Sequence, residues 1–255
     1  MNLVLGRRKA LVERVDIVNQ RINYLRTTNK KWKRDSSLST WMRLGVTPTT
    51  PLLINGLLTM TQKNRKLPLG KGQRFVISHA GCEDGFLNGC ELVFKGISTD
   101  GREYHNEMNS KIFEKWVNEQ LESALLEKNL IIMDNASYHS VREEGTKTPT
   151  SNSRKGDMIN WLTKNNMNFN NKAKKPELYG IVKLNKGPPI YKVDEFLKRK
   201  GHEVLRLPPY HYELNPIELI WGDLKGFVGR ENSTFKAEDV KALIKKGFAQ
   251  IDSAN

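Results

Sequence analysis

The chain has 255 residues, 38% of them hydrophobic, which is enough to bury one sizeable α/β core with helical additions. Its 42 lysines and arginines exceed its 28 aspartates and glutamates by 14, which favours a polyanionic partner, with nucleic acid as the economical choice. Ribosome or membrane-surface binding would satisfy this charge equally well. No apolar run approaches the roughly 20 residues that span a bilayer. The N-terminal stretch MNLVLGRRKALVERV is too polar for a signal peptide, so we expect a soluble intracellular protein.

The first part of the chain, residues 1–34, predicts a basic amphipathic helix from Arg7 to Lys33. Its arginines lie away from one apolar side, which we expect to consist of Leu11, Val15, Val18, Ile22 and Leu25. The next part, residues 35–66, is expected to be irregular, because two prolines and an Asn-Gly pair interrupt any regular period.

Two antiparallel strands are predicted next, at Gln73–His79 and Glu91–Lys95, joined by the connection CEDGFLNG. Cys82 and Cys90 lack the spacing and neighbours of a zinc site, and we expect them to be reduced, small residues near this hairpin. Apolar residues at helical spacing then predict a helix over Asn109–Glu127.

The segment Leu130–Ser140, LIIMDNASYHS, is a short apolar run that ends abruptly in an aspartate and small polar residues. It predicts a buried strand with Asp134 at its carboxyl end. Catalytic groups gather at such strand ends, and an aspartate buried there needs a cation or hydrogen-bond donors. A turn-forming role in the Asp-Asn pair is the plain alternative. His139 is a candidate for orienting groups of the site, with a helix-start or phosphate-contacting role equally open.

The connection that follows is basic and polar and becomes helical near Lys155, so its loops are candidates for phosphate contact. Inserted helices are expected within residues 148–166 and 172–201, before a strand at His202–Leu207. A C-terminal helix is predicted for Phe235–Ile251. We find no internal sequence repeat.

The stretch Leu207–Lys225, LPPYHYELNPIELIWGDLK, delivers Glu218 to the first turn of a helix. Asn215 is predicted to be the N-cap and Pro216 the first helical residue. The buried stripe of this helix is expected to contain Ile217, Ile220, Trp221, Leu224 and Phe227. The plain alternative for Glu218 is a capping-box contact with the backbone amide of Asn215.

Together, MDNASYH and LPPYHYELNPIELIW resemble, in that order, the DDE catalytic domain of the mariner superfamily of transposases, relatives of retroviral integrases. The likeness extends more weakly through GKGQRFVISHAG and ELVFKG, over roughly residues 66–230. It implies an α/β fold, with a ribonuclease H-like mixed sheet flanked by helices, and catalytic, metal-binding acids at Asp134 and Glu218. It also implies Mg²⁺ (or Mn²⁺), two ions if the site is complete, and phosphoryl transfer that cuts transposon ends and joins them to target DNA.

The family has three acids, and the first is not recognisable in residues 36–66, so we expect the first strand to be disrupted. Trp41-Met42 must be encoded TGG ATG, which contains the aspartate codon GAT in the frame that begins at the third base of each codon. With suitable codons for Ser39–Gly45, that frame reads Tyr-Leu-Asp-Glu-Thr-Trp, the kind of context the family's first acid has. We hypothesise an out-of-frame or misjoined segment, with coincidence as the alternative. Loop or turn positions are expected for the other nearby acids, Asp35, Glu83 and Asp84.

The sequence therefore predicts a DDE transposase domain over residues 67–230, inactive as written, and a C-terminal helix in residues 231–255 that packs back on the core. DNA is the expected partner and the nucleus the expected compartment, a homodimer is an option, and no membrane contact is expected. The short region before residue 35 leaves no room for helix-turn-helix modules, so specific recognition of transposon ends is not expected. A host-adopted, non-catalytic DNA-binding protein is the main alternative. A structural protein whose acids only cap helices and form turns is the other.

Overall fold

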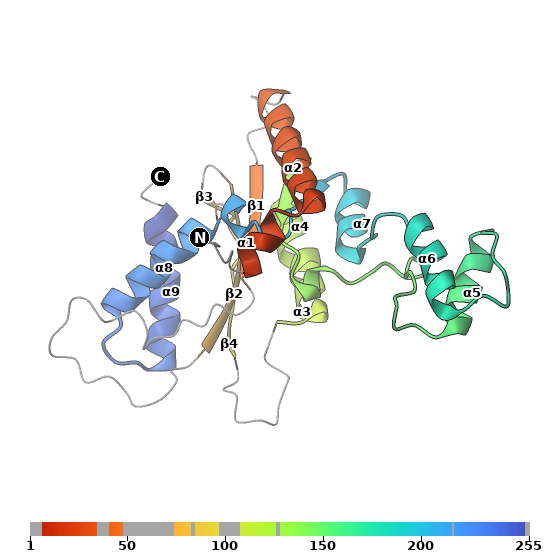
Figure 1. Cartoon of the computed structure of the whole chain (residues 1–255). Coiled ribbons are helices and arrows are strands. Elements are labelled where there is room, and N and C mark those ends of the chain that lie inside the picture. Colours follow the sequence, from red (N-terminus) through yellow and green to blue (C-terminus); the bar gives the residue numbers. More distant parts are fainter. Residues whose placement is uncertain are drawn as a thin grey trace, which may run out of the picture. The chain divides into compact units, whose positions relative to one another are not determined.

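The computed structural model describes residues 7–34, 41–47, 74–82, 85–96, 108–125, 128–215 and 217–252 (Figure 1). The chain divides into two units. The first contains Met1–His139 and Phe196–Asn255, and the second, Ser140–Glu195, is inserted between these two stretches. Among the described residues, no helix is long and apolar enough to cross a membrane.

The first unit is built on a mixed sheet in which the strands follow the order β3-β2-β1-β5-β6, with β4 paired to β2. Strand β2 runs antiparallel to β1, β3 and β4, whereas β5 runs parallel to both β1 and β6. The strands are β1 (Trp41–Thr47), β2 (Arg74–Cys82), β3 (Gly85–Phe86), β4 (Leu92–Gly96), β5 (Leu130–Met133) and β6 (Glu203–Arg206). The predicted strands before and after the CEDGFLNG connection, and those leading to Asp134 and Leu207, are therefore present.

Strand β1 lies within the part of the chain that we expected to be irregular. Trp41–Thr47 pairs with β2 on one side and β5 on the other, with Arg43 opposite Ile132. The prediction was wrong for these residues, because a strand between two neighbours has its backbone groups satisfied on both edges without a strong sequence period. The rest of residues 35–66 lies outside the described residues, and so does the predicted turn at Glu83 and Asp84.

The helices of the first unit follow the predicted order with shifted ends. Asn109 caps the first helix after the hairpin, since its Oδ1 accepts a hydrogen bond from the backbone amide of Ile112 at 3.0 Å. A π-helical turn at Val117–Leu121 interrupts the helix predicted there. The described α-helices of the first unit are α1 (Arg7–Val12), α2 (Val15–Arg34), α3 (Ser110–Trp116), α4 (Glu122–Ala124), α8 (Ile217–Glu231) and α9 (Ala237–Asp252). Helix α7 (Lys192–Arg199) crosses the boundary between the two units.

Helix α2 buries a different face from the one the sequence suggested. Its buried residues are Ile17 and Tyr24, whereas Val15 is 75% exposed. Tyr24 packs with Ile132 of β5 and with Leu207, which follows β6. The predicted apolar side contained more residues. The buried face is instead the one on which Ile17 and Tyr24 lie, seven positions apart, and Tyr24 makes the contact with the sheet.

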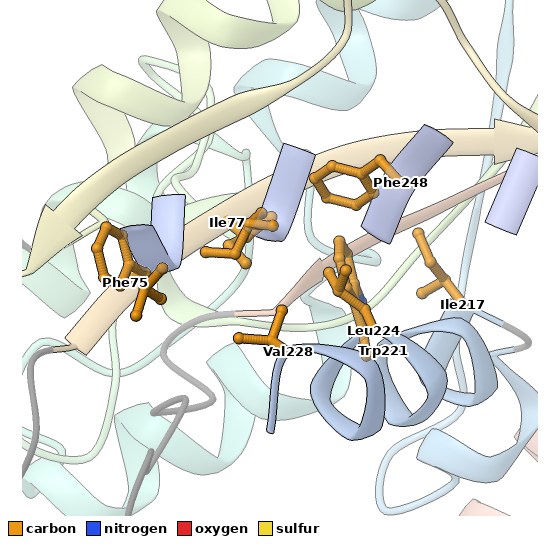
Figure 2. Close-up of a cluster of buried hydrophobic side chains, with 9 residues drawn as sticks. Phe75, Ile77, Ile217, Trp221, Leu224, Val228 and Phe248 are labelled. Carbon is orange, nitrogen blue, oxygen red and sulfur yellow. The ribbon is translucent and has the colours of Figure 1, made fainter. Parts of the chain in front are cut away.

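The core next to the predicted catalytic helix is formed by α8 and α9 against strand β2 (Figure 2). Helix α8 contributes Trp221 and Leu224, and α9 contributes Phe248. The buried cluster contains Phe75, Ile77, Ile217, Trp221, Leu224, Val228, Val240, Ile244 and Phe248. The first turn of α8 is thus attached to the sheet through Ile217 and Trp221, which fixes the backbone on both sides of Glu218.

The second unit contains two helices, α5 (Lys155–Lys164) and α6 (Lys175–Asn185), which repeat one pattern at a spacing of 20 residues (175 − 155 = 20). Each starts with a pair of basic residues and an acid two positions after the pair, RKGD in α5 and KKPE in α6. The next residue and the one four positions later are buried in both: Met158 and Leu162, then Leu178 and Val182. The two helices share this pattern of burial and charge but few identical residues.

The two ends of the second unit are joined by backbone contacts. Arg142 and Tyr191 form an isolated antiparallel bridge. The backbone amide of Glu143 donates to the carbonyl of Ile190 at 3.0 Å, and that of Lys192 donates to the carbonyl of Val141 at 2.9 Å. The second unit is therefore closed at its two ends and has its own buried cluster of apolar side chains.

Gly247 tests the close packing of α8 and α9. A Cβ atom at Gly247 would lie 2.5 Å from Leu224 Cδ1 and 3.0 Å from Phe227 Cδ1. We expect Gly247→Ala to lower the free energy of unfolding by about 1–3 kcal/mol through overpacking, as measured by urea denaturation. Gly229→Ala is the matched control, because nothing lies within 4 Å of its added Cβ, and helix propensity should raise stability slightly. Equal unfolding midpoints for the two variants would contradict this packing.

Candidate active site

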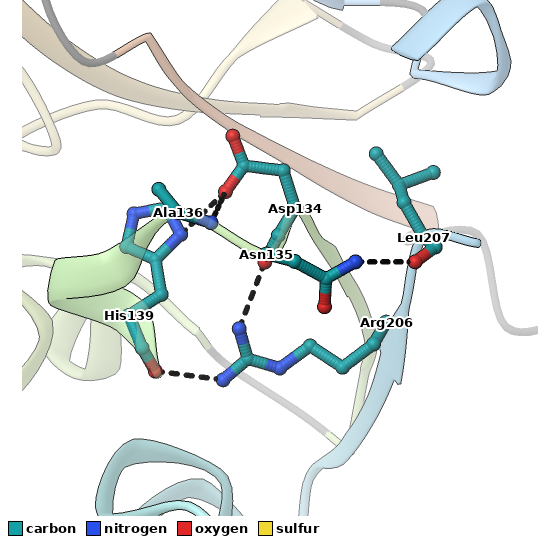
Figure 3. A network of polar contacts seen from close by, with 6 residues as sticks. All are labelled: Asp134, Asn135, Ala136, His139, Arg206 and Leu207. Atoms are coloured by element: carbon teal, nitrogen blue, oxygen red, sulfur yellow. Dashed lines mark hydrogen bonds and ion pairs between the residues drawn. The ribbon is translucent and has the colours of Figure 1, made fainter. Parts of the chain in front are cut away.

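Asp134 comes directly after β5, at the carboxyl end of a strand that pairs with β1 and β6. Its side chain is 28% exposed. One carboxylate oxygen, Oδ1, accepts the backbone amide of Ala136 at 3.0 Å and lies 2.6 Å from Nδ1 of His139 (Figure 3). Within the described part of the chain, Oδ2 has no hydrogen-bond or ion-pair partner. One oxygen is therefore fixed in place, and the other is free to bind a ligand.

His139 is fully buried, and its ring stacks on Phe113 with 4.1 Å between ring centroids. Burial lowers the pKa of His139, and the charge and hydrogen bond of Asp134 offset this only in part. The ring is therefore neutral at pH 7. Its Nδ1 contacts Oδ1 of Asp134 at 2.6 Å, so the buried ring restricts the orientation of that carboxylate.

Arg206, the last residue of β6, holds the backbone on both sides of this contact. Its Nη1 donates to the carbonyl oxygen of Asp134 at 2.8 Å, and its Nη2 donates to that of His139 at 2.9 Å (Figure 3). Asn135 adds a third link to the same region, because its Nδ2 donates to the carbonyl of Leu207 at 2.6 Å. The loop that carries Asp134 is thus fastened to the neighbouring strand.

Glu218 lies in the first turn of α8 and is half-buried. The backbone amide of Asn215 donates to the carbonyl of Tyr212 at 2.9 Å, so it is not held by a capping box with Glu218. In the part of the chain that the structure describes, no hydrogen bond or ion pair holds the Glu218 carboxylate. The plain alternative for Glu218, a contact with the amide of Asn215, therefore does not hold.

The cap of α8 also differs from the prediction. Asn215 is buried, and its Oδ1 has no hydrogen-bond partner among the described residues, so its side chain does not cap the helix. Instead the carbonyl of Asn215 accepts the backbone amide of Glu218 at 3.1 Å. Pro216, the predicted first helical residue, lies outside the described residues. A proline has no backbone N–H, so this helix start has one donor fewer to satisfy.

The two predicted acids lie 84 positions apart in the sequence (218 − 134 = 84), and both belong to the first unit. Burial is the main reason why the pKa of Glu218 is raised. Two charges act on it as well: Lys225 has the larger effect and lowers the pKa, and Asp134 has the smaller effect and raises it. Lys225 lies two turns along the same helix, and burial lowers its pKa while the charge of Glu218 raises it.

The chemistry of these side chains fits a divalent cation. Carboxylate oxygens are the hard ligands that Mg²⁺ prefers, and Oδ2 of Asp134 and the carboxylate of Glu218 have no competing partner among the described residues. A bound cation would also favour the charged form of Glu218, whose pKa is raised mainly by burial. Among the described residues, however, no group of three or more histidine, cysteine, aspartate or glutamate side chains could hold a metal ion.

Comparison with known proteins agrees with the arrangement of these two segments. Residues 102–244, which include both acids and more than half of the chain, match the family model described as DDE superfamily endonuclease. The chain belongs to the DDE superfamily of endonucleases. The family expected from the two acidic segments is thereby confirmed.

A solved structure shares the fold of this DDE domain. The crystal structure of the Mos1 mariner paired-end complex with Mn has a TM-score of 0.52 and 14% sequence identity, over 94% of this chain and 57% of that one. The Mos1 transposase paired-end complex with left transposon end has a TM-score of 0.48 and 14% identity, over 92% of this chain and 55% of that one. The chain thus spans little more than half the length of these proteins. The expected ribonuclease H-like fold is confirmed, and no curated protein matches the chain.

Two residues of this DDE domain were missed by sequence reasoning. Arg206 carries a signal only in retrospect, because it is a lone basic residue at the end of an apolar strand that enters the second acidic segment. Lys225 could have been found from its spacing, since a residue seven positions after Glu218 lies on the same face of a helix.

Arg206→Lys tests the fastening of the DDE loop. Lysine keeps the positive charge but not the planar fork that reaches two carbonyl oxygens. We expect the free energy of unfolding to fall by about 1–3 kcal/mol, as measured by urea denaturation. Arg154→Lys, at an exposed arginine of the second unit, is the control and should change stability little. A wild-type midpoint for Arg206→Lys would show that the two contacts contribute nothing.

Proposed function

We propose that this chain is the metal-dependent DNA phosphoryl-transfer domain of a mariner-like transposase, with Asp134 and Glu218 as two of its three metal-binding acids. The single observation that carries the proposal is that both acids, in a member of the DDE superfamily, keep carboxylate oxygens without a partner among the described residues. The relative with 57% of its length covered is a complex with Mn, which favours the same kind of ion here.

The bound ions, Mg²⁺ or Mn²⁺, would activate a water molecule or a DNA 3′ hydroxyl and stabilise the leaving oxygen. The protein's own part is to hold the acids still: His139 orients Asp134, Arg206 fastens its loop, and the core under α8 fixes Glu218. The third acid belongs on β1, which runs parallel to β5 beside Asp134. The residues of β1, WMRLGVT, include no acid, so the chain as written is proposed to be inactive.

The same gap favours a second candidate, a host-adopted DNA-binding protein that keeps the fold without the chemistry. Both candidates place the protein on DNA in the nucleus. They differ in metal binding and cleavage, which the two experiments below measure. A homodimer stays a prediction from the family resemblance.

Metal binding is tested by thermal unfolding with and without millimolar Mn²⁺. We expect Mn²⁺ at ten to a hundred times its Kd to stabilise the wild type by about 1–3 kcal/mol. Asp134→Asn and Glu218→Gln should each lose this response, while Asp223→Asn, an exposed acid on the same helix as Glu218, should keep it. A response that survives both substitutions would refute the metal site.

Glu218→Gln is also expected to change the stability of the metal-free protein, in the opposite direction to its effect with Mn²⁺. A raised pKa in the folded state means that the stability contributed by protonated Glu218 is present at low pH and is lost as pH rises through that pKa. Without metal at pH 7, Glu218→Gln should therefore raise Tm, although it abolishes the response to Mn²⁺.

Cleavage is tested by restoring the acid that the shifted frame encodes. Thr40–Gly45 is replaced by Tyr-Leu-Asp-Glu-Thr-Trp, which puts an aspartate at position 42, opposite Ile131 of β5. With Mn²⁺, this chain should nick supercoiled plasmid DNA, whereas the same replacement with Asn in place of Asp should not. Equal nicking by both, or by neither, would count against an acid on β1 as the missing ligand. Sequencing of the transcript over residues 36–66 tests the frame itself.

A further inference from the structure

The second unit has a strong excess of positive charge. Residues 140–195 contain 11 lysines and arginines and 6 aspartates and glutamates, a difference of 11 − 6 = 5. The basic residues are Arg142, Lys147, Arg154, Lys155, Lys164, Lys172, Lys174, Lys175, Lys183, Lys186 and Lys192. Most of them are exposed, so the unit presents much of this charge to solvent.

The charge at the two helix starts is not neutralised within the unit. In the described part of the chain, Arg154, Lys155, Lys174 and Lys175 have no ion-pair partner. The acids beside them are used elsewhere: the backbone amide of Arg154 donates to the carboxylate of Asp157 at 3.0 Å, and that of Lys174 donates to Glu177 at 2.9 Å. These carboxylates satisfy backbone donors, and the basic side chains are left for a partner.

Basic residues at helix starts oppose the helix dipole, which is positive at that end. Each costs a few tenths of a kcal/mol or more in an isolated helix. The arrangement occurs twice, at corresponding positions of α5 and α6, next to the same pattern of buried residues. A polyanion that lies against these basic residues would compensate their unfavourable interaction with the dipoles of both helices.

We propose that the second unit is a separate DNA-binding module, in which Arg154, Lys155, Lys174 and Lys175 contact phosphates of duplex DNA. The positive charge of this unit favours a polyanion as its partner. That the polyanion is DNA rests on the proposed function. Contacts of this kind read the backbone and carry no sequence preference. The backbone bridge between Arg142 and Tyr191 joins the two ends of the unit, which has its own buried cluster of apolar side chains.

The test uses the full chain with four glutamine substitutions, Arg154→Gln, Lys155→Gln, Lys174→Gln and Lys175→Gln. The matched control removes four exposed lysines at and before α9: Lys236→Gln, Lys241→Gln, Lys245→Gln and Lys246→Gln. Binding to a random-sequence duplex is measured by fluorescence anisotropy over a range of salt concentrations. We expect the first variant to bind at least about tenfold more weakly and its salt slope to fall by up to about 3.6, at 0.9 per phosphate contact. The control should lose less than about threefold.

Stability separates a binding role from a structural one. Removing positive charge from helix starts should leave Tm unchanged or raise it, so weaker DNA binding with a preserved Tm supports the proposal. If the fourfold variant unfolds, the pairs Arg154→Gln with Lys155→Gln and Lys174→Gln with Lys175→Gln give the same test, each with a twofold or larger loss expected.

Three results would overturn the proposal: unchanged DNA affinity, an equal loss in the control, or competition by polyglutamate as effective as that by DNA at equal charge. Repeating the measurement in Asp134→Asn separates it from the proposed function. The loss of affinity on removing the four charges should be the same in that background, even if the metal response and the cleavage are both absent.

Discussion

The start of α8 and the loop after β5 are each fixed by packing and hydrogen bonds, and these two places carry the acids. Asp134 comes directly after a strand, and Glu218 is in the first turn of a helix, so neither can move away without disturbing regular structure. The packing of Ile217 and Trp221 fixes the start of α8, and the contacts of Arg206 fix the loop that carries Asp134. Burial is the main cause of the raised pKa of Glu218, and the charge of Asp134 adds a smaller effect of the same sign. Glu218 is thus held half-buried with no hydrogen bond in the described residues, which leaves its carboxylate available to a ligand.

The relation between the acids is set by the sheet and by the packing of α8, and not by the length of chain between them. The second unit occupies most of the 84 positions that separate them, yet its two ends are joined by one bridge between Arg142 and Tyr191. An insertion that starts and ends at the same place adds little constraint to the unit that receives it. The long separation between the acids is therefore compatible with one continuous sheet in the first unit.

The sequence predicted the features that depend on residues close together along the chain. The apolar run that stops at Asp134 and the N-P-I-E helix start both depend on neighbours along the chain, and both acids were placed on the right elements. The contacts of Arg206 depend on the register between β5 and β6, in which Met133 lies opposite Arg206, and no single segment contains that information. The prediction of the buried face of α2 was wrong for the same reason. Tyr24 is buried because it packs against Ile132 of β5 and Leu207, which follows β6.

Strand β1 takes its place in the sheet without carrying the acid that catalysis would require. Its place between β2 and β5 requires backbone hydrogen bonds on both edges, and the stretch WMRLGVT supplies them without an acid. A strand at this position is therefore no sign of a complete site, and the missing acid is no argument against membership of the DDE superfamily. Asp134 and Glu218 are different, because burial makes the charged form of Glu218 unfavourable and Glu218 makes no hydrogen bond in the described residues that would offset this. A chain selected for folding alone would gain by losing one of them, and this chain keeps both.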